Sequence, residues 1–292
     1  MMNKVEVTPG TPDRLSNNRV AVIGLGLMGG SLAMALKGHC ALLMGSDPNQ
    51  SARALASELA IFDQLSADPG EILPQSDLVI LATQVCTIID LIHELANLHP
   101  GCAVVLDIGS TKSEITKAMD ALPTRFDPIG GHPMCGKTSP SIANADPSIF
   151  LGATFALTPL PRTSQNAIAL AEQLVYQIGA RPLRLPVDLH DRWVAATSHL
   201  PYLLANALVS ITPDDIIDLI GPGFRSATRL ADSSPTMMLD ILKTNRENIL
   251  RVLSLYQSQL KRLAETLQGG SQDELHQVLD YGFTRYTELL GE

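Results

Sequence analysis

Short apolar runs alternate with segments of helical periodicity from Arg19 to about Pro186. Helix-like stretches such as SARALASELA and IIDLIHELANL separate the apolar runs RVAVIGLG, ALLMGSD, DLVILAT, AVVLDIG, ATFALTP and RPLRLP. Continuous apolar strands joined by helical crossovers are typical of a parallel sheet that is covered on both faces. The pattern therefore predicts an α/β domain over residues 17–186.

The pattern changes after Val187, where apolar positions follow a helical period instead of an alternating one. The steps of three and four predict one helix from about Thr236 to Leu267, on the order of 45 Å long. One small domain does not cover such a helix, so we expect a second copy of the chain to cover the rest. Residues 187–292 are thus predicted to form a helical domain of a homodimer. The positions that set the period are Leu242, Ile249, Leu253, Tyr256, Leu260, Leu263 and Leu267.

Charge and composition narrow the class of partner. The chain has 292 residues and a formal net charge of −9, without a compensating cluster of Lys and Arg. An acidic protein of this kind is a poor partner for nucleic acid or an anionic membrane. The uncharged run from Val20 to Leu36 is interrupted by four glycines and, at about 17 residues, is at the lower limit for a membrane span. We therefore expect small-molecule chemistry.

The four cysteines lie far apart, with no C-x-x-C pair and no histidine at metal-ligand spacing. This spacing predicts free thiols in a reducing compartment and no structural metal, so the cytoplasm is the expected location. Residues 1–16 mix Pro, Gly and polar residues without periodicity, which predicts a mobile tail.

A glycine-rich motif follows the first strand directly. Gly24, Gly26 and Gly29 form G-x-G-x-x-G before a helix, and Asp47 ends the second strand about twenty residues later. The glycines allow a tight turn and a close approach to a pyrophosphate at the helix N-terminus. Asp47 would bond the adenosine ribose and repel a 2′-phosphate, which favours NAD over NADP. The alternative is that the glycines serve helix-strand packing alone.

Three further residues lie at the ends of later predicted strands, which is the ligand-binding edge of a parallel sheet. They are Thr83, Ser110 and His132. His132 is either a reactive group or a residue that holds its Gly-Gly-His-Pro turn. Cys135 suggests a Cys-His nucleophile, but hydride transfer needs no covalent intermediate, so a wall residue is the better interpretation. The predicted cofactor-binding residues are Gly24, Gly26, Leu27, Met28, Gly29, Asp47 and Thr83.

Five segments, in order from Asn18, resemble the prephenate/arogenate dehydrogenase family of tyrosine biosynthesis. They are GLGLMGGS, LDIGSTK, GGHPMCGK, HDRWVAATSHLPY and GFRSATRLADSSP. The resemblance implies a Rossmann-type NAD-binding domain, followed by an all-helical dimerisation domain of the kind at the C-terminus of 6-phosphogluconate dehydrogenase. It also implies NAD-dependent oxidative decarboxylation of prephenate to 4-hydroxyphenylpyruvate, or of arogenate to tyrosine.

By position, the resemblance implies that His132 is the catalytic histidine with Ser110 beside it, that Arg229 binds a substrate carboxylate, and that His199 is a second active-site histidine. Arg225 lies one helical turn before Arg229, and the pair is either substrate-binding or a solvated, salt-bridged face. His199 is alternatively a packing histidine. The chain departs from the family pattern at Ser226, Ala227 and Gln84.

Three residues of the HDRW segment have simpler interpretations: Trp193 is predicted to be core, and the His190–Asp191 pair to begin a helix. The family chemistry gives His132 its role. As hydride leaves for the nicotinamide and the ring carboxylate departs, a neutral imidazole accepts the hydroxyl proton, so activity should fall below about pH 6.5. Competing hypotheses are another NAD-dependent hydroxyacid dehydrogenase, which would use a catalytic lysine, and a non-catalytic NAD sensor.

Overall fold

A single sheet organises the computed structural model, which describes residues 15–136 and 141–291. Its eight strands have the order β3-β2-β1-β4-β5-β6-β7-β8. All neighbours are parallel except β6 and β7, which are antiparallel, so the predicted parallel sheet is confirmed with one exception. The strands are β1 (Arg19–Ile23), β2 (Leu42–Ser46), β3 (Gln64–Ser66), β4 (Leu78–Leu81), β5 (Ala103–Asp107), β6 (Phe126–Pro133), β7 (Thr154–Pro159) and β8 (Arg181–Arg184).

The segment that joins β6 to β7 explains the antiparallel pair. Its described part holds two short 3-10 helices, η4 (Ile142–Asn144) and η5 (Pro147–Phe150). Parallel neighbours are usually joined by a crossover helix on one face of the sheet, and the described part of this segment, residues 134–136 and 141–153, contains no α-helix.

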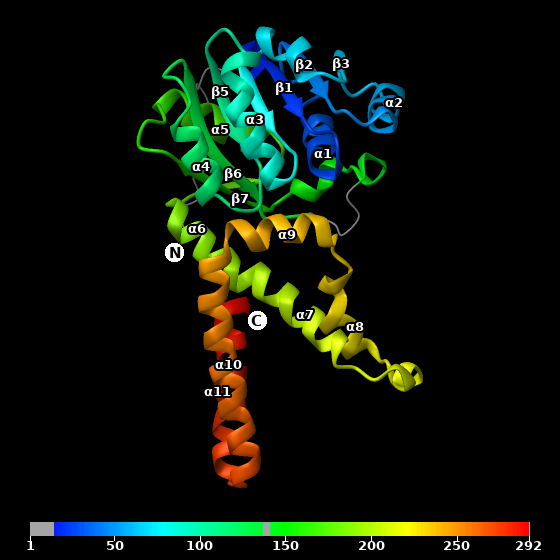
Figure 1. Ribbon diagram of the computed structural model, residues 1–292, viewed down its shortest axis with the longest axis vertical. Coiled ribbons are helices and arrows are strands. Elements are labelled where there is room, and N and C mark those ends of the chain that lie inside the picture. The colour runs from blue at the N-terminus through cyan, green and yellow to red at the C-terminus, as the bar shows by residue number, and fades with distance from the viewer. Residues whose placement is uncertain (1–14, 137–140, 292) are drawn as a thin grey trace. The chain divides into compact units, whose positions relative to one another are not determined.

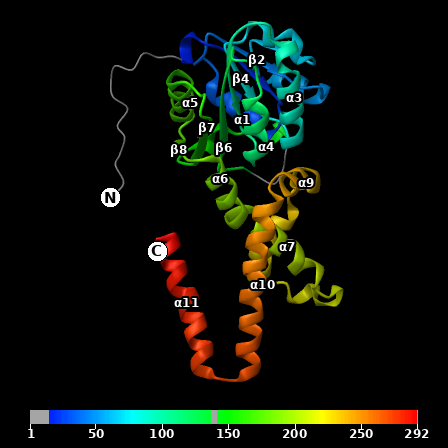
Figure 2. The same cartoon turned by 60° about the vertical axis from the view of Figure 1, so that its left-hand side comes forward.

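Helices cover both faces of the sheet, as predicted. On one face pack α1 (Leu27–Leu36), α2 (Gln50–Glu58) and α5 (Gln165–Gln177), and on the other α3 (Val85–Leu98) and α4 (Ser113–Asp120). Figure 2 shows α5 and α3 on opposite sides of the strands. Successive residues of β1 enter the two apolar cores in turn, which is why the strand is continuously apolar.

The chain is helical after β8. The elements as far as Asn245 belong to the same compact unit as the sheet. Of these, α6 and α9 lie at the carboxyl edge of the strands (Figure 1). They are α6 (Val187–Val194), the π-helix η6 (Ala195–His199), α7 (Leu200–Ser210), η7 (Asp214–Leu219), α8 (Pro222–Thr228), η8 (Arg229–Asp232) and α9 (Pro235–Thr244).

Arg246–Glu292 forms a second compact unit. It contains α10 (Arg246–Gly269) and α11 (Gln272–Leu290), which pack against each other and are joined through Gly270. Gly270 has φ +77°, a conformation that favours glycine at the end of a helix. The predicted boundary at 186/187 stays a prediction, and it falls where β8 gives way to α6.

The prediction of one helix from Thr236 to Leu267 is wrong. α9 ends at Thr244, and Asn245 has φ −124° and ψ 26°, outside the helical range. The buried Asn245 side chain donates a hydrogen bond to the carbonyl of Asp191, far away in the sequence, at 2.7 Å. Short polar side chains can form such bonds in place of helix continuation. The break falls in a stretch without apolar residues between Leu242 and Ile249, which the predicted helix passed over as a step of two turns.

The N-terminal prediction needs a small correction. Residues 1–14 of the predicted tail lie outside the described residues, but Leu15 and Ser16 begin a short 3-10 helix, η1 (Leu15–Asn17), and Leu15 is buried in the core. The uncharged run from Val20 to Leu36 forms β1, the glycine turn and α1. Within residues 15–136 and 141–291, the helices are too short or too polar to cross a membrane.

Candidate active site

The glycine-rich loop packs too tightly for side chains at two of its positions. Gly24 has φ +98°, and a Cβ built there would lie 2.6 Å from Cγ2 of Thr83. A Cβ at Gly29 would lie 1.9 Å from the carbonyl oxygen of Gly24. Any larger residue would push α1 away from the loop, so these glycines hold the helix N-terminus at the sheet edge. Such an N-terminus is an anion-binding position, which suits a pyrophosphate.

Asp47 is fixed at the side of a cavity of about 420 Å³ beside this loop. Its carboxylate accepts hydrogen bonds from the backbone N–H groups of Leu25 and Asn49, both at 2.8 Å. The cavity lies between these residues, Gly26 and Ile142, and its volume suits the adenosine half of a dinucleotide. The acid predicted to contact the ribose is therefore held at the wall of a suitable cavity.

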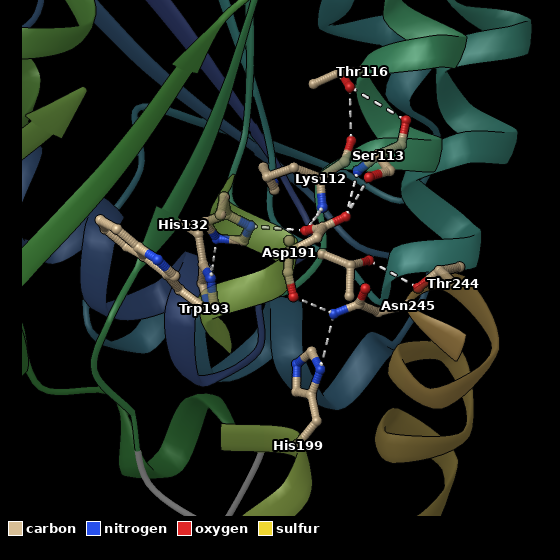
Figure 3. Close-up of polar contacts among 12 residues, drawn as sticks. Lys112, Ser113, Thr116, His132, Asp191, Trp193, His199, Thr244 and Asn245 are labelled. Carbon is tan, nitrogen blue, oxygen red and sulfur yellow. Dashed lines mark hydrogen bonds and ion pairs between the residues drawn. The ribbon is translucent and has the colours of Figure 1, made fainter. Parts of the chain in front are cut away.

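A chain of three side chains ends at His132, within β6 at the carboxyl edge of the sheet. His132 Nδ1 lies 2.9 Å from His190 Nε2, and His190 Nδ1 lies 2.8 Å from Asp191 Oδ1. Asp191 is itself fixed by the start of α4, because its carboxylate accepts hydrogen bonds from the N–H groups of Lys112 and Ser113, each at 2.8 Å (Figure 3). The acid therefore ties α6 to the N-terminus of α4 and orients the first imidazole.

The hydrogen-bonded chain Asp191–His190–His132 determines which nitrogen of each imidazole ring carries the proton. An ionised carboxylate only accepts hydrogen bonds, so His190 carries its proton on Nδ1 and, when neutral, accepts at Nε2. His132 must then donate from Nδ1, which leaves the lone pair on Nε2 free. This is the tautomer that a general base requires.

Burial and nearby charge keep the site histidines neutral. Burial, with further contributions from His190, Lys112 and His199, lowers the pKa of His132 well below its ordinary value. Burial also lowers the pKa of His199 to about 4. Burial opposes ionisation of Asp191, but hydrogen bonds from His190, Ser113 and the N–H of Lys112 hold its pKa below the ordinary value. An ionised Asp191 and a neutral His132 are the states that the proton assignment needs.

A buried ion pair anchors the strand just before His132. Lys112 and Asp107 are completely buried and contact each other through Nζ and Oδ2. Lys112 Nζ also donates to the carbonyl of Gly131 at 2.6 Å, and Asp107 accepts from the Gly131 N–H at 3.3 Å. Burial raises the pKa of Asp107 and lowers the pKa of Lys112, while their mutual attraction opposes both shifts. With both polar groups of Gly131 held, the position of the next residue is fixed.

The other predicted site residues differ in whether they contact the residues around the Asp191–His190–His132 chain. His199, in the π-helix η6, is buried, and its Nδ1 lies 3.2 Å from Asn245 Nδ2. Ser110 is partly buried, three residues after β5. Arg225 and Arg229 are exposed on α8 and η8, and neither side chain forms a hydrogen bond or ion pair with another described residue. Their substrate roles remain predictions.

Two predictions about neighbouring residues have clear outcomes. Burial raises the pKa of Cys135 to about 11, so a thiolate nucleophile is disfavoured. Lys137, the last residue of GGHPMCGK, lies outside the described residues. The prediction that Trp193 is core is wrong, because its side chain is 48% exposed. The buried residues of α6 are His190, Asp191 and Val194, and Trp193 is not among them.

Sequence reasoning gave no role to His190, Asp191, Lys112 or Asn245. A signal was present for one pair: His190 and Asp191 are adjacent within a segment already quoted for its resemblance. The prediction that they begin a helix is wrong, because α6 begins at Val187 and the pair lies in its middle. Lys112 also lies in a quoted segment, LDIGSTK, but its role, like that of Asn245, depends on burial and on contacts between distant segments.

The fold and the site together define a class. A doubly wound sheet, a glycine-rich loop, an acid at the end of β2 and a neutral histidine at the carboxyl edge are the parts of a dinucleotide-dependent oxidoreductase. Family models make this specific: the nucleotide-binding domain of prephenate dehydrogenase matches residues 32–183, and its dimerization domain matches residues 186–281. The chain belongs to the prephenate dehydrogenase family.

Individual proteins agree with the family models. The prephenate dehydrogenase of Bacillus subtilis (strain 168) is 32% identical over 79% of this chain, which spans 65% of that relative's length. A crystal structure of prephenate dehydrogenase from A. aeolicus, in complex with hydroxyphenyl propionate and NAD+, has a TM-score of 0.86 at 27% identity, covering 94% of this chain and 99% of that one. Synechocystis arogenate dehydrogenase has a TM-score of 0.80 at 27% identity, covering 93% and 99%.

Proposed function

We propose that this protein catalyses the NAD-dependent oxidative decarboxylation of prephenate to 4-hydroxyphenylpyruvate in tyrosine biosynthesis. The observation that carries the proposal is the hydrogen-bonded chain Asp191–His190–His132, which leaves a neutral imidazole with a free lone pair at the carboxyl edge of the sheet. The similar A. aeolicus enzyme, whose structure holds NAD+ and a hydroxyphenyl compound, supports the choice of cofactor and of an aromatic product.

The described residues fit NAD. Gly24, Gly26 and Gly29 leave room for the pyrophosphate at the start of α1, Asp47 meets the ribose at the wall of the cavity, and Thr83 contacts the glycine turn. When bound, the nicotinamide supplies a hydride acceptor. The remaining predicted contacts, Leu27 and Met28, are the first residues of α1.

The reaction then needs little from the protein. Nε2 of His132 accepts the proton of the ring hydroxyl as the hydride leaves the same carbon, and Ser110 orients that hydroxyl. The bond to the ring carboxylate breaks, carbon dioxide departs, and the electron pair of that bond moves through the ring to the oxygen. The oxygen takes the proton back from His132 as the ring becomes aromatic. Arg229, assisted by Arg225, binds the side-chain carboxylate, and His199 contacts the substrate near His132. Aromatisation supplies the driving force.

The direct test is NADH formation followed by absorbance, with prephenate and arogenate offered side by side. Turnover of prephenate at a rate well above that of arogenate supports the proposal. Turnover of neither substrate by the folded protein contradicts it.

A second candidate function is arogenate dehydrogenase, which would form tyrosine directly. The similarity to the Synechocystis arogenate dehydrogenase favours it. Arogenate differs from prephenate by an amine in place of the side-chain ketone, a difference that His132 does not contact in the mechanism above. The side-by-side assay decides between the two.

The broader alternatives receive less support. A hydroxyacid dehydrogenase would need a catalytic lysine, but Lys112, which lies near His132, is completely buried and held by Asp107 and Gly131. Burial of a polar group costs free energy, and a non-catalytic sensor has no use for two buried, oriented imidazole rings.

The proposed assembly is a homodimer. The family model over residues 186–281 is a dimerization domain. The second compact unit carries many exposed large apolar side chains, which are typical of a surface that another chain covers. We also propose a cytoplasmic location, which agrees with the four free cysteines. The exposed side chains are Leu250, Leu255, Leu260, Leu267, Leu279, Tyr281, Phe283, Tyr286, Leu289 and Leu290.

Asp47 should set the preference between the two nicotinamide cofactors. Its fixed carboxylate would meet the 2′-phosphate of NADP, and one repulsive contact of this kind is worth a few kcal/mol. We expect kcat/KM to be at least about tenfold higher with NAD, and the gap to narrow in Asp47→Ser. Asp63→Ser is the matched control, since Asp63 also accepts a backbone N–H, that of Leu43, outside the cavity. Equal efficiency of the wild type with both cofactors would disprove the assignment.

His190 should matter through the ring that it orients. In His190→Gln the link from Asp191 to His132 loses its imidazole, so we expect kcat to fall by roughly 10- to 100-fold, a typical loss for a residue that orients a reactive histidine. His99→Gln removes another buried imidazole, bonded to the carbonyl of Ser76, and should lower thermal stability without a comparable loss of kcat. Equal kcat losses in the two variants would assign His190 to folding alone.

A further inference from the structure

Asn245 reaches the active site from the junction between α9 and α10. Its side chain is buried, with 3% of the residue exposed. The amide nitrogen Nδ2 lies 2.7 Å from the backbone oxygen of Asp191 and 3.2 Å from Nδ1 of His199 (Figure 3). One amide group thus links the break in the chain, the helix that carries the acid and the second active-site histidine.

These contacts determine which way the amide faces. The Asp191 backbone oxygen can only accept, so the atom of Asn245 that approaches it must be the NH₂ nitrogen and not the amide oxygen. The same nitrogen has a second hydrogen, and the group beside it is His199 Nδ1. Nδ1 must therefore accept, and a neutral imidazole that accepts at Nδ1 carries its proton on Nε2.

We propose that Asn245 is a positioning residue that holds His199 as the Nε2–H tautomer, so that His199 donates a hydrogen bond to the substrate while His132 accepts its proton. The proposal rests on the proposed function for the identity of the substrate. The assignment of the tautomer itself rests on the contacts of Asn245 alone.

The two active-site imidazoles then have opposite hydrogen-bonding roles at Nε2, and Asp191 determines both. The Asp191 carboxylate, acting through His190, gives His132 a free lone pair at Nε2. The Asp191 backbone carbonyl, acting through Asn245, gives His199 a hydrogen at Nε2. A substrate with two carboxylates needs donors, and a buried neutral ring supplies one without the cost of a buried cation.

The local backbone has an unusual form that suits this role. His199 ends the π-helix Ala195–His199, in which the N–H of Leu200 bonds the carbonyl of Ala195, five residues back. Single π-turns within helices occur frequently at functional sites. Pro201, which has no N–H, follows in the first turn of α7.

The tautomer is measurable without any assay. ¹⁵N spectra of the histidine rings distinguish Nδ1–H from Nε2–H, and the spectrum of His199→Gln identifies the His199 signals by their loss. In the wild type we expect His199 to carry its proton on Nε2. In Asn245→Asp, the near-isosteric carboxylate can only accept, so His199 should switch to Nδ1–H. Thr244→Val is the matched control: Thr244 bonds Thr111 and neither histidine, so this variant should keep the wild-type tautomer.

Kinetics provide the second measurement on the same variants. Asn245→Asp should raise KM for prephenate by roughly tenfold or more, the usual consequence of losing a hydrogen bond to a charged group, and leave KM for NAD nearly unchanged. Thr244→Val should change both by about twofold at most, and thermal melts check that each variant folds.

Two results would overturn the proposal: an Nδ1–H tautomer of His199 in the wild type, or a folded Asn245→Asp variant with unchanged tautomer and unchanged KM. The wild-type spectrum decides even if the variant does not fold. If the tautomer switches as expected but neither prephenate nor arogenate is turned over, the assignment of Asn245 is supported and the proposed function fails.

Discussion

Replacement of His132 by Asn should lower kcat by roughly 100- to 10,000-fold, the usual contribution of a positioned general base. Asn can still donate a hydrogen bond to His190 from nearly the same position, but it has no lone pair that can take a proton. The variant therefore removes the base and preserves its support. NAD binding should be nearly unchanged, because the glycine-rich loop and Asp47 lie on other strands.

The pH profile of the wild type gives an independent reading of the same group. The base must be neutral, and burial lowers the pKa of His132 well below its ordinary value, so kcat/KM should stay high below pH 6.5 and fall only at lower pH. The structure thus corrects the expectation of a loss that begins near pH 6.5. Folding stability should begin to fall at a higher pH than activity does. The unfolded histidine binds a proton near pH 6.5 while the folded one resists it, so the free energy of unfolding decreases as pH falls below that value.

Single-turnover kinetics and titration with NAD check the expected loss of kcat and the unchanged NAD binding of His132→Asn. A variant that binds NAD and retains more than about a tenth of the wild-type kcat would return His132 to a role in holding its turn. His99→Gln again serves as the control for the loss of a buried imidazole.

Truncation of Arg229 should produce the second large effect, on substrate binding. A carboxylate that loses a bidentate guanidinium partner in a partly desolvated site costs roughly 2 to 5 kcal/mol, so Arg229→Ala should raise KM for prephenate by about 30-fold or more. KM for NAD should hardly change. In the structure the Arg229 side chain forms no hydrogen bond or ion pair with the described residues, so its truncation should cost little stability.

Two further variants sharpen the result. Arg229→Lys keeps the charge but not the planar fork, so it should recover part of the loss. Arg225→Ala removes a second exposed guanidinium one helical turn away and should have the smaller effect. If Arg229 lies on a solvated face without a substrate role, Arg229→Ala will bind prephenate normally in steady-state kinetics, and thermal melts will show at most a small change.

Features encoded within short segments could be predicted from the sequence. The glycine turn, the acid at the end of β2 and the strand ends at Thr83, Ser110 and His132 follow from local pattern and from the direction of parallel strands. Each depends on residues close in sequence, or on a rule that holds for every sheet of this kind. The structure confirms the sheet and both helical layers.

Features that depend on packing between distant segments could not be predicted. His132 and His190 are 58 positions apart, and their contact exists because Asp191 holds α6 against the start of α4. The exposure of Trp193 depends on which side of α6 turns inward. The helix α9 ends at Thr244, and the side chain of the next residue, Asn245, has its partner in α6.

The buried pair of Lys112 and Asp107 restricts how the sequence can change over time. Loss of one partner leaves an uncompensated charge in the core, which costs about 3 to 5 kcal/mol, whereas exchange of both for apolar residues is often neutral. Natural proteins have only about 5 to 15 kcal/mol of stability in total, so the single-step intermediate is strongly selected against. Because both residues also hold Gly131 beside His132, even a neutral double exchange would disturb the base. Descendants of this chain should therefore keep the two residues or lose them together with the activity.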